Sequence, residues 1–247
     1  MKTWDIDINC DVGEGVGNEV ALFHHISSCN IACGGHAGDM ESMTEVIRLA
    51  KRNQTKIGVH PSFPDRQNFG REVMDIPALE LIQSLKAQVT MFRGILEKEN
   101  AQLHHIKAHG ALYNQTAKDE GLAKTYLEAL EDYKKNVLLY VPYGSVIAKV
   151  AQSRGFQLWY EAFADRNYND DLSLVSRKQG NALIQEPEKV LEHILPIIKK
   201  EKVVSIMGNK IGIEAKTLCV HGDTASALEI LVYLTQELPK HRVRLLK

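Results

Sequence analysis

The feature that most constrains the fold of this chain is a recurring short apolar segment that ends in His, Asp, Glu or Lys, typically followed by glycine or proline. It recurs in the segments DINCDVGEG, NIACGGHAGD, IGVHP, IKAHGALYN, LWYEAFADR and LCVHGD. These segments alternate with longer stretches whose apolar residues have helical spacing. Short, nearly all-apolar strands that alternate with helices indicate a parallel sheet covered by helices on both faces.

The polar residues at the carboxyl ends of the predicted strands favour a barrel. An open parallel sheet carries functional groups at its switch point, whereas a barrel collects them from all its strands. We therefore predict one α/β domain over residues 1–247, a seven-stranded parallel β/α barrel, and this chain length is typical of such barrels. The predicted strands are 4–10, 28–33, 56–59, 103–109, 136–141, 157–162 and 217–220, with a hairpin over 203–213. The predicted helices are 19–27, 40–53, 77–99, 119–134, 146–154, 186–200 and 224–237, and a further helical segment begins at 111.

Composition excludes several classes of partner. The formal net charge is −1 and no basic block is present, so neither nucleic acid nor an acidic membrane is expected as a partner. No apolar run approaches the ~18 residues of a transmembrane helix. The amino-terminal MKTWDIDINCD carries acids where a signal peptide needs an apolar stretch, so we expect a cytoplasmic protein. Its four cysteines lie in or beside apolar runs, and we expect them to be reduced and buried.

The first predicted strand places three hydrogen-bond acceptors on one face. Side chains alternate along a strand, so Asp7, Asn9 and Asp11 point the same way, and Glu14 follows in a glycine-rich loop. Such a row is costly in a core unless it binds a metal, another cation or its own members. The alternative for Asp7 is a salt-bridged structural acid.

The segment HHIKAHGALYN places a cation beside an imidazole. Lys107 and His109 share one face of the predicted strand, and Gly110 then allows a turn. A buried pair of this kind is suited to holding and protonating a reacting group. The alternative is a strand end at a solvated rim.

Further candidates follow the other strands. His36 follows a glycine pair, while Asp39 is equally suited to capping the next helix. Arg66 and Arg71 in a long loop suggest an anion clamp, whereas Gln88 is expected at the surface. One mouth would then collect Asp7, Asn9, Asp11, Glu14, His36, His60, Lys107, His109, Glu161, Asp165, His221 and Asp223.

Interleaved carboxylates and imidazoles serve general acid–base catalysis or metal-assisted hydrolysis. Lysine and arginine suit a carboxylate or a phosphoryl group. The chain contains no Walker loop, no GxGxxG motif and no serine nucleophile elbow, so any nucleotide site would be unconventional. The residues alone indicate a hydrolase-like barrel enzyme for a small anionic substrate, and they do not name that substrate.

Six motifs in order resemble the LamB/YcsF family over essentially the whole chain. They are DINCDVGEG, CNIACGGHAGD, GVHPSFPDRQNFGR, IKAHGALYN, EAFADRNY and LCVHGDT. The resemblance implies a TIM-like barrel of the glycoside hydrolase/deacetylase type. It also implies ATP-dependent opening of 5-oxoproline to glutamate, using ATP with Mg²⁺ and two further subunits.

The resemblance and the residue chemistry together assign roles as hypotheses. The catalytic candidates are Asp11, Lys107, His109, Glu161, His36 and His60, with Asp11 or Glu161 as the base. The substrate- or phosphate-binding candidates are Asn9, Glu14, Arg66, Arg71, Asp165, Arg166, His221 and Asp223. The candidate metal ligands are Asp7, Asp11, His36 and His60. The alternatives are a divalent-metal deacetylase for an N-acetylated sugar and a non-catalytic subunit that presents substrate.

Overall fold

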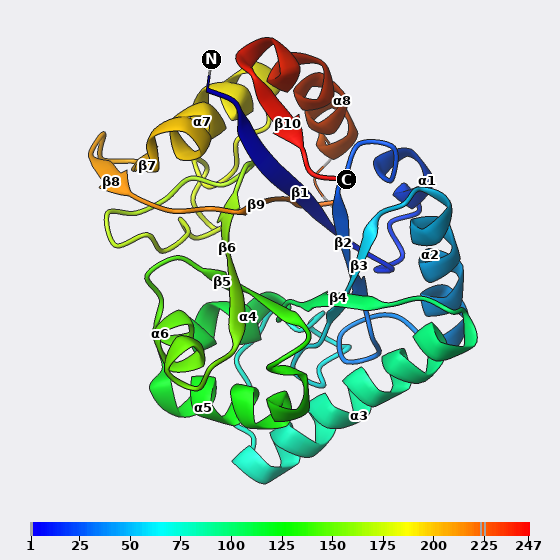
Figure 1. Ribbon diagram of the computed structural model, residues 1–247. Helices are drawn as coiled ribbons and strands as arrows, with labels where there is room; N and C mark the ends of the chain where they lie inside the picture. The colour runs from blue at the N-terminus through cyan, green and yellow to red at the C-terminus, as the bar shows by residue number, and fades with distance from the viewer. Residues whose placement is uncertain (1, 223, 225) are drawn as a thin grey trace.

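The computed structural model describes residues 2–222, 224 and 226–247, and it shows a ring of strands surrounded by helices (Figure 1). The strands of the ring are β1 (Trp4–Val12), β2 (Ser28–Ala32), β3 (Lys56–His60), β4 (Leu103–Ile106), β5 (Leu138–Pro142), β6 (Gln157–Phe163) and β9 (Thr217–Val220). Neighbouring strands pair in parallel, and β9 pairs with both β6 and β1, which closes the ring. The predicted seven-stranded β/α barrel is confirmed.

A further strand that the sequence analysis missed lies beside the start of β1. This strand, β10 (Val243–Leu245), pairs in parallel with Trp4–Ile6, whereas β9 pairs with β1 only from Asp7 onward. The two short strands therefore share one edge of β1. The predicted hairpin is present as the antiparallel pair β7 (Lys202–Val204) and β8 (Lys210–Gly212).

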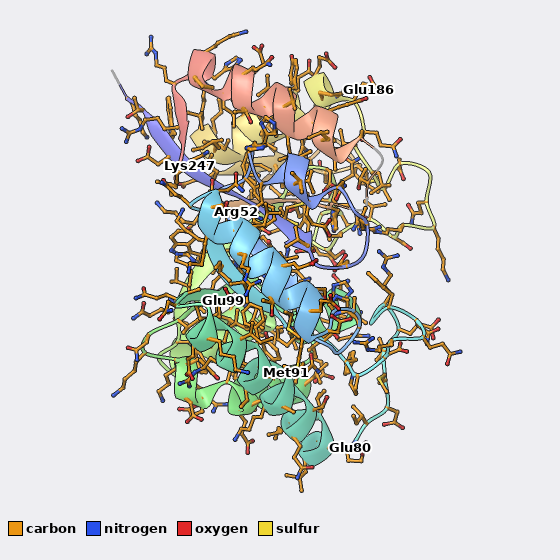
Figure 2. The ribbon with its side chains drawn as sticks, turned by 90° about the vertical axis from the view of Figure 1, so that its right-hand side faces the viewer. Arg52, Glu80, Met91, Glu99, Glu186 and Lys247 are labelled. Carbon is orange, nitrogen blue, oxygen red and sulfur yellow. The ribbon has the colours of Figure 1, made fainter. Side chains whose placement is uncertain are left out.

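Helices cover the outside of the barrel. In chain order they are α1 (Glu19–Leu22), α2 (Met40–Arg52), α3 (Ala78–Lys98), α4 (Gly110–Thr116), α5 (Glu120–Ala129), α6 (Val146–Ser153), α7 (Pro187–Lys200) and α8 (Ala227–Glu237), with the 3₁₀ turns η1 (Glu131–Tyr133) and η2 (Leu238–His241). Figure 2 shows α2 and α3 side by side, and Arg48 of α2 forms an ion pair with Glu99 at the end of α3. None of the helices in the described residues is long and apolar enough to span a membrane.

Three predicted elements are shorter than expected. The predicted helix 19–27 ends at Leu22, and the predicted helix 119–134 divides into α5 and η1. The strand predicted over 103–109 ends at Ile106, although backbone hydrogen bonds from Lys107 to Val59 and from His109 to Pro61 extend the same alignment. The side chains that follow β4 therefore still lie at the mouth of the barrel.

The apolar core fills the space between the strands and the helices, and it includes all four cysteines as free thiols. One prediction is wrong here, because Gln88 is buried. Its side-chain oxygen accepts a hydrogen bond from the Ser62 amide, and its nitrogen donates to the Ser62 carbonyl. Gln88 thus substitutes for a backbone partner and holds the segment that follows β3 against α3.

Candidate active site

Lys107 occupies the centre of the barrel mouth and is 2% exposed. Its ammonium lies 3.1 Å from Asp11 Oδ1 and 3.0 Å from Glu161 Oε1, and it donates to Asn9 Oδ1 at 3.2 Å. These groups come from β1, β6 and the end of β4, so closure of the barrel brings them together. The alternation predicted for β1 is confirmed, since Asn9 and Asp11 both reach this ammonium.

The electrostatics of this cluster favour its charged form. Burial disfavours the ammonium of Lys107, but the attraction of Asp11 and Glu161 outweighs it and holds the pKa of the lysine well above its usual range. Burial likewise opposes the charge on Asp11, yet His60 and Lys107 hold the pKa of that carboxyl well below its usual range. A buried, permanently cationic lysine is a preformed site for an anionic oxygen.

A group of three imidazoles borders this cluster on the side of β2 and β3. The rings of His36 and His109 stack with their centroids 3.6 Å apart, and His60 Nε2 lies 3.0 Å from His109 Nδ1. Glu14 Oε1 lies 3.1 Å from His36 Nε2 and 3.3 Å from His109 Nδ1. His60 Nε2 is also 3.4 Å from Asp11 Oδ2, so the two clusters share Asp11.

Burial and hydrogen bonding act in opposite directions on these groups. Burial lowers the pKa of His36 to about 4 and also lowers that of His109, so both rings are neutral near pH 7. Burial raises the pKa of Glu14, but the imidazoles of His109 and His36, which both face its Oε1, outweigh it and bring the value to about 2. Two sets of three side chains bring metal-ligating atoms close together, namely Asp11 with His60 and His109, and Glu14 with His36 and His109.

On the other side of Lys107 lies an Asp–His pair. His221 Nδ1 donates to Asp165 Oδ1 at 2.9 Å, and the backbone amide of His221 donates to Asp165 Oδ2 at 3.0 Å. Asp165 is fully buried; burial opposes its charge, but His221 holds the pKa of the carboxyl below its usual range. The pair fixes the imidazole so that Nε2 is its free nitrogen. Asp223, a predicted binding residue, lies outside the described residues.

A cavity of about 920 Å³ opens over these groups. Its floor includes Lys107, Glu161 and His221, and its rim includes four exposed basic side chains. The rim residues are Arg71, Lys118, Arg177 and Lys178.

The structure separates the two arginines of the predicted anion clamp. Arg71 lines the cavity, whereas Arg66 donates hydrogen bonds to the carbonyls of Gly34 and Gly38 and does not line it. Arg66 therefore holds the loop after β2 in place. Arg166 lines the cavity, yet its guanidinium donates to the carbonyls of Val175 and Ala182 and so organises the loop after β6.

Two further candidates have structural roles. Asp7 is buried beneath the mouth, where its Oδ1 accepts 2.6 Å hydrogen bonds from Ser28 and Thr217, and it belongs to neither group of metal-ligating atoms in the described residues. The structure therefore does not place Asp7 with the other candidate ligands. Asp39 caps α2 through a reciprocal capping box with Ser42.

The sequence analysis missed Asn30 and His105, which are both fully buried inside the barrel. Asn30 Nδ2 donates to Asn9 Oδ1 and Asp11 Oδ1 at 2.8 and 2.7 Å, and His105 Nε2 lies 2.7 Å from Asn30 Oδ1. Gly58 makes room for the imidazole, because a Cβ there would collide with the ring of His105. Two signals in the sequence could have found them. His105 lies two residues before Lys107 and so points to the same face, and Asn30 is a polar residue within an otherwise apolar strand.

Comparison with known proteins identifies the family of this chain. The family model for the LamB/YcsF family matches residues 6–247. The A subunit of 5-oxoprolinase from Haemophilus influenzae (strain PittEE) is 38% identical over 240 residues, covering 97% of this chain and 98% of the relative. The corresponding protein from Pyrococcus furiosus is 35% identical over 246 residues, covering 98% and 96%.

Among solved structures, the lactam utilization protein from Thermus thermophilus superposes with a TM-score of 0.91 at 30% identity. The match covers 98% of each chain. On the family model, the relatives and this fold together, the chain belongs to the LamB/YcsF family.

Proposed function

We propose that this chain is the lactam-hydrolysing subunit of an ATP-dependent 5-oxoprolinase and converts 5-oxo-L-proline to L-glutamate together with two further subunits. The names of its relatives, a subunit of 5-oxoprolinase and a lactam utilization protein, support the reaction class. The observation that carries the proposal is the buried cation of Lys107 between Asp11 and Glu161, at the floor of a cavity that also contains the Asp165–His221 pair.

The chemistry requires such a site because a lactam carbonyl is a poor electrophile. Transfer of a phosphoryl group from ATP to the carbonyl oxygen activates the ring carbon. Water then adds to that carbon, the C–N bond breaks, and the ring nitrogen takes a proton. The resulting carboxyl phosphate is hydrolysed to the carboxylate and phosphate. The phosphoryl transfer and the hydrolysis of the carboxyl phosphate both build negative charge on oxygen, which a preorganised ammonium stabilises.

Separate side chains of this chain take the roles in proton transfer and in anion binding. His221 is the general base for water in our proposal, because Asp165 holds its Nδ1 proton and leaves Nε2 free. Lys107 binds the developing oxyanion or the substrate carboxylate, and Asp11 and Glu161 keep the ammonium charged and oriented. Once His221 has taken a proton from water, it is the group available to protonate the departing nitrogen.

The size of the cavity supports a second ligand group. About 920 Å³ is at the upper end of the range for drug-sized ligands and exceeds what a five-membered lactam needs. The four basic rim residues, Arg71, Lys118, Arg177 and Lys178, are suited to phosphoryl oxygens. We therefore propose that the phosphorylated intermediate or the nucleotide phosphates extend from the floor toward this rim.

The test is glutamate release and ATP hydrolysis with 5-oxoproline, for the chain alone and with its two partner subunits. We expect turnover only in the complete set and its loss in Lys107→Ala. Full activity of both Lys107→Ala and Asp11→Ala in the reconstituted complex would show that the site assignment is wrong. A complex of Lys107→Ala that assembles and still binds 5-oxoproline but is inactive would also exclude the purely substrate-presenting role.

One observation favours a second candidate function. The cluster of Asp11, His60 and His109 also suits a divalent-metal deacetylase acting on an N-acetylated sugar. Release of acetate from such sugars by the metal-loaded chain alone, without ATP or partner subunits, would favour this alternative. Absence of 5-oxoproline-dependent turnover in every combination of subunits would point the same way.

A further inference from the structure

The hydrogen bonds of His60 and His109 determine which ring nitrogen of each is free. His60 Nδ1 lies 2.8 Å from the Lys107 carbonyl, and His109 Nε2 lies 2.9 Å from the Phe69 carbonyl. A carbonyl oxygen only accepts hydrogen bonds, so both of these nitrogens carry protons. When each ring carries a single proton, the remaining nitrogens, His60 Nε2 and His109 Nδ1, present lone pairs.

These two lone pairs face each other at 3.0 Å, with carboxylate oxygens on either side. Asp11 Oδ2 is 3.4 Å from His60 Nε2, and Glu14 Oε1 is 3.3 Å from His109 Nδ1. With one proton on each ring, no hydrogen lies between the two nitrogens, and each nitrogen also faces a carboxylate oxygen. A shared cation resolves this arrangement, since a buried acceptor needs a proton or a metal ion as its partner.

We propose that Asp11, His60 and His109 bind one divalent transition-metal ion of the zinc type, with Glu14 as a charged neighbour outside the ligand set. Ligand atoms about 2.1 Å from a metal ion are separated by about 3.0 Å in octahedral and about 3.4 Å in tetrahedral geometry. The separation of His60 Nε2 from His109 Nδ1, 3.0 Å, and that of His60 Nε2 from Asp11 Oδ2, 3.4 Å, lie in that range.

The surroundings of the ligands support the assignment. Metal-bound histidines commonly donate their second N–H to a backbone carbonyl or a carboxylate, which is the arrangement of both rings here. Imidazole nitrogen favours Zn²⁺, Co²⁺ or Ni²⁺ over Mg²⁺, which prefers oxygen and water. The site is thus distinct from the Mg²⁺ that accompanies ATP.

Access and the role of the metal follow from the cavity. Asp11, Glu14, His60 and His109 all line it, so a small molecule reaches the site. The metal assignment stands on geometry alone. Its use, polarising the carbonyl of a lactam beside Lys107, rests on the proposed function.

His36 has a different place in the proposal. Its Nε2 hydrogen-bonds Glu14 Oε1, whereas its Nδ1 has no hydrogen-bond partner in the described residues. We assign it as a positioning residue for Glu14, outside the ligand set. This separates the Asp11–His60–His109 set from the alternative set of Glu14, His36 and His109.

The experiment measures metal binding directly. The full chain is stripped with a chelator, dialysed and titrated with Co²⁺, with bound metal measured by elemental analysis and visible absorption. We expect one Co²⁺ per chain with absorption bands of a nitrogen- and oxygen-ligated ion, and no displacement by excess Mg²⁺. Failure to bind a stoichiometric metal ion would overturn the proposal and leave a shared proton between the two rings.

Variants identify the ligands. Loss of an outer-shell partner typically weakens metal affinity about 10- to 100-fold, so His60→Gln and His109→Gln should each weaken Co²⁺ binding by more than about 100-fold. His36→Gln should weaken it by about 10-fold or less, and the exposed control His24→Ala should not change it. Binding that persists in His60→Gln but is lost in His36→Gln would also overturn the assignment.

Two further readouts keep the result interpretable. Co²⁺ should raise the melting temperature of the wild-type chain but not that of His60→Gln, provided that circular dichroism shows both to be folded. A variant that does not fold is replaced by Asp11→Asn, for which weakened Co²⁺ binding is again expected. Metal binding without oxoproline turnover in the complete complex would reject the proposed function alone, whereas turnover by a chain that binds no metal would reject this inference alone.

Discussion

Two aspartates on one face of β1 show how the barrel interior divides into a structural and a functional region. Asp7 belongs to what we call the lower layer, together with Ser28, Lys56 and Thr217. Asp11, four residues further along, belongs to the upper cluster with Lys107 and Glu161. Residue type, strand and face are the same, so only the partners differ.

The different partners of Asp7 and Asp11 shift the pKa values of the two carboxyl groups in opposite directions. Burial raises the pKa of Asp7, because its closest partners are the neutral hydroxyl groups of Ser28 and Thr217. Asp11 is also penalised by burial, but His60 and Lys107 lower its pKa below the usual range. A buried carboxyl satisfied by hydroxyl groups stabilises a fold, whereas one held among cations and imidazoles keeps a charge ready for chemistry.

The largest expected effect comes from removing the cation of the upper cluster. Lys107→Met should lower the rate of 5-oxoproline-dependent glutamate release by about 10³-fold, since loss of one preorganised charge that stabilises an oxyanion costs this much. Steady-state kinetics of the reconstituted complex measure the effect. Assembly with the partner subunits, checked by size-exclusion chromatography, is the control, and an active assembled variant would contradict the role of Lys107.

The matched pair Asp11→Asn and Asp7→Asn tests the comparison directly. Asp11→Asn should lower turnover about 10²-fold because it removes a charge that orients Lys107. Asp7→Asn keeps an oxygen for Ser28 and Thr217, so turnover should not change and unfolding free energy should fall by about 1 kcal/mol. Equal loss of turnover in both variants would abolish the distinction between the two regions.

The Asp165–His221 pair offers a smaller test within the mouth. Asp165→Asn leaves the volume unchanged but no longer holds the Nδ1 proton of His221, so the wrong ring tautomer becomes accessible. We expect turnover to fall by about 10²-fold with little change in KM. Adding His221→Gln to Asp165→Asn should cause little further loss of turnover, because the two residues act as one unit. If the losses of turnover in the two single variants add in the double variant, the pairing is wrong.

A half-buried histidine outside the barrel, His193, shows what burial of an imidazole costs where no chemistry is proposed. Burial lowers the pKa of His193 in α7 to about 4 from 6.5. As pH falls from 6.5 to 4, the unfolded chain binds a proton that the folded chain does not, so stability falls. The loss at pH 4 should be up to about 2 kcal/mol, reduced from the full shift because the ring is partly exposed.

His193→Gln removes that titration, and denaturant unfolding between pH 4 and pH 7 measures the change. The variant should lose less stability than wild type on acidification. Turnover of the complete complex at pH 7 should be the same for both proteins. An unchanged pH dependence of stability would show that the ring is already protonated in the folded chain at acidic pH.

Local signals were sufficient for most of the fold. The apolar strands, the amphipathic spacing of α2, α3 and α7 and the Gly208–Asn209 turn of the hairpin are properties of short segments, and the structure confirms them. The prediction missed β10 because three residues at Val243–Leu245 carry little periodicity. Their strand conformation depends on pairing with β1, some 240 positions away in the chain.

The candidate site was predictable as a collection but not as an arrangement. Alternation along β1 predicted that Asn9 and Asp11 lie on one face. The same rule predicted that Lys107 and His109, two residues apart, both point toward the mouth of the barrel. The same alternation could not separate Asp7 from Asp11. Nor could it show that Arg66 binds backbone carbonyls while Arg71 lines the cavity.

The sequence by itself determined the alternation of strands and helices, the parallel barrel and the set of ionisable side chains at its mouth. Only the tertiary structure decided which of these groups meet, because barrel closure joins residues from β1, β3, β4, β6 and β9. Hydrogen bonds to the Lys107 and Phe69 carbonyls then select the tautomers of His60 and His109. Such pairings depend on distances between strands, and no pattern along one strand encodes those distances.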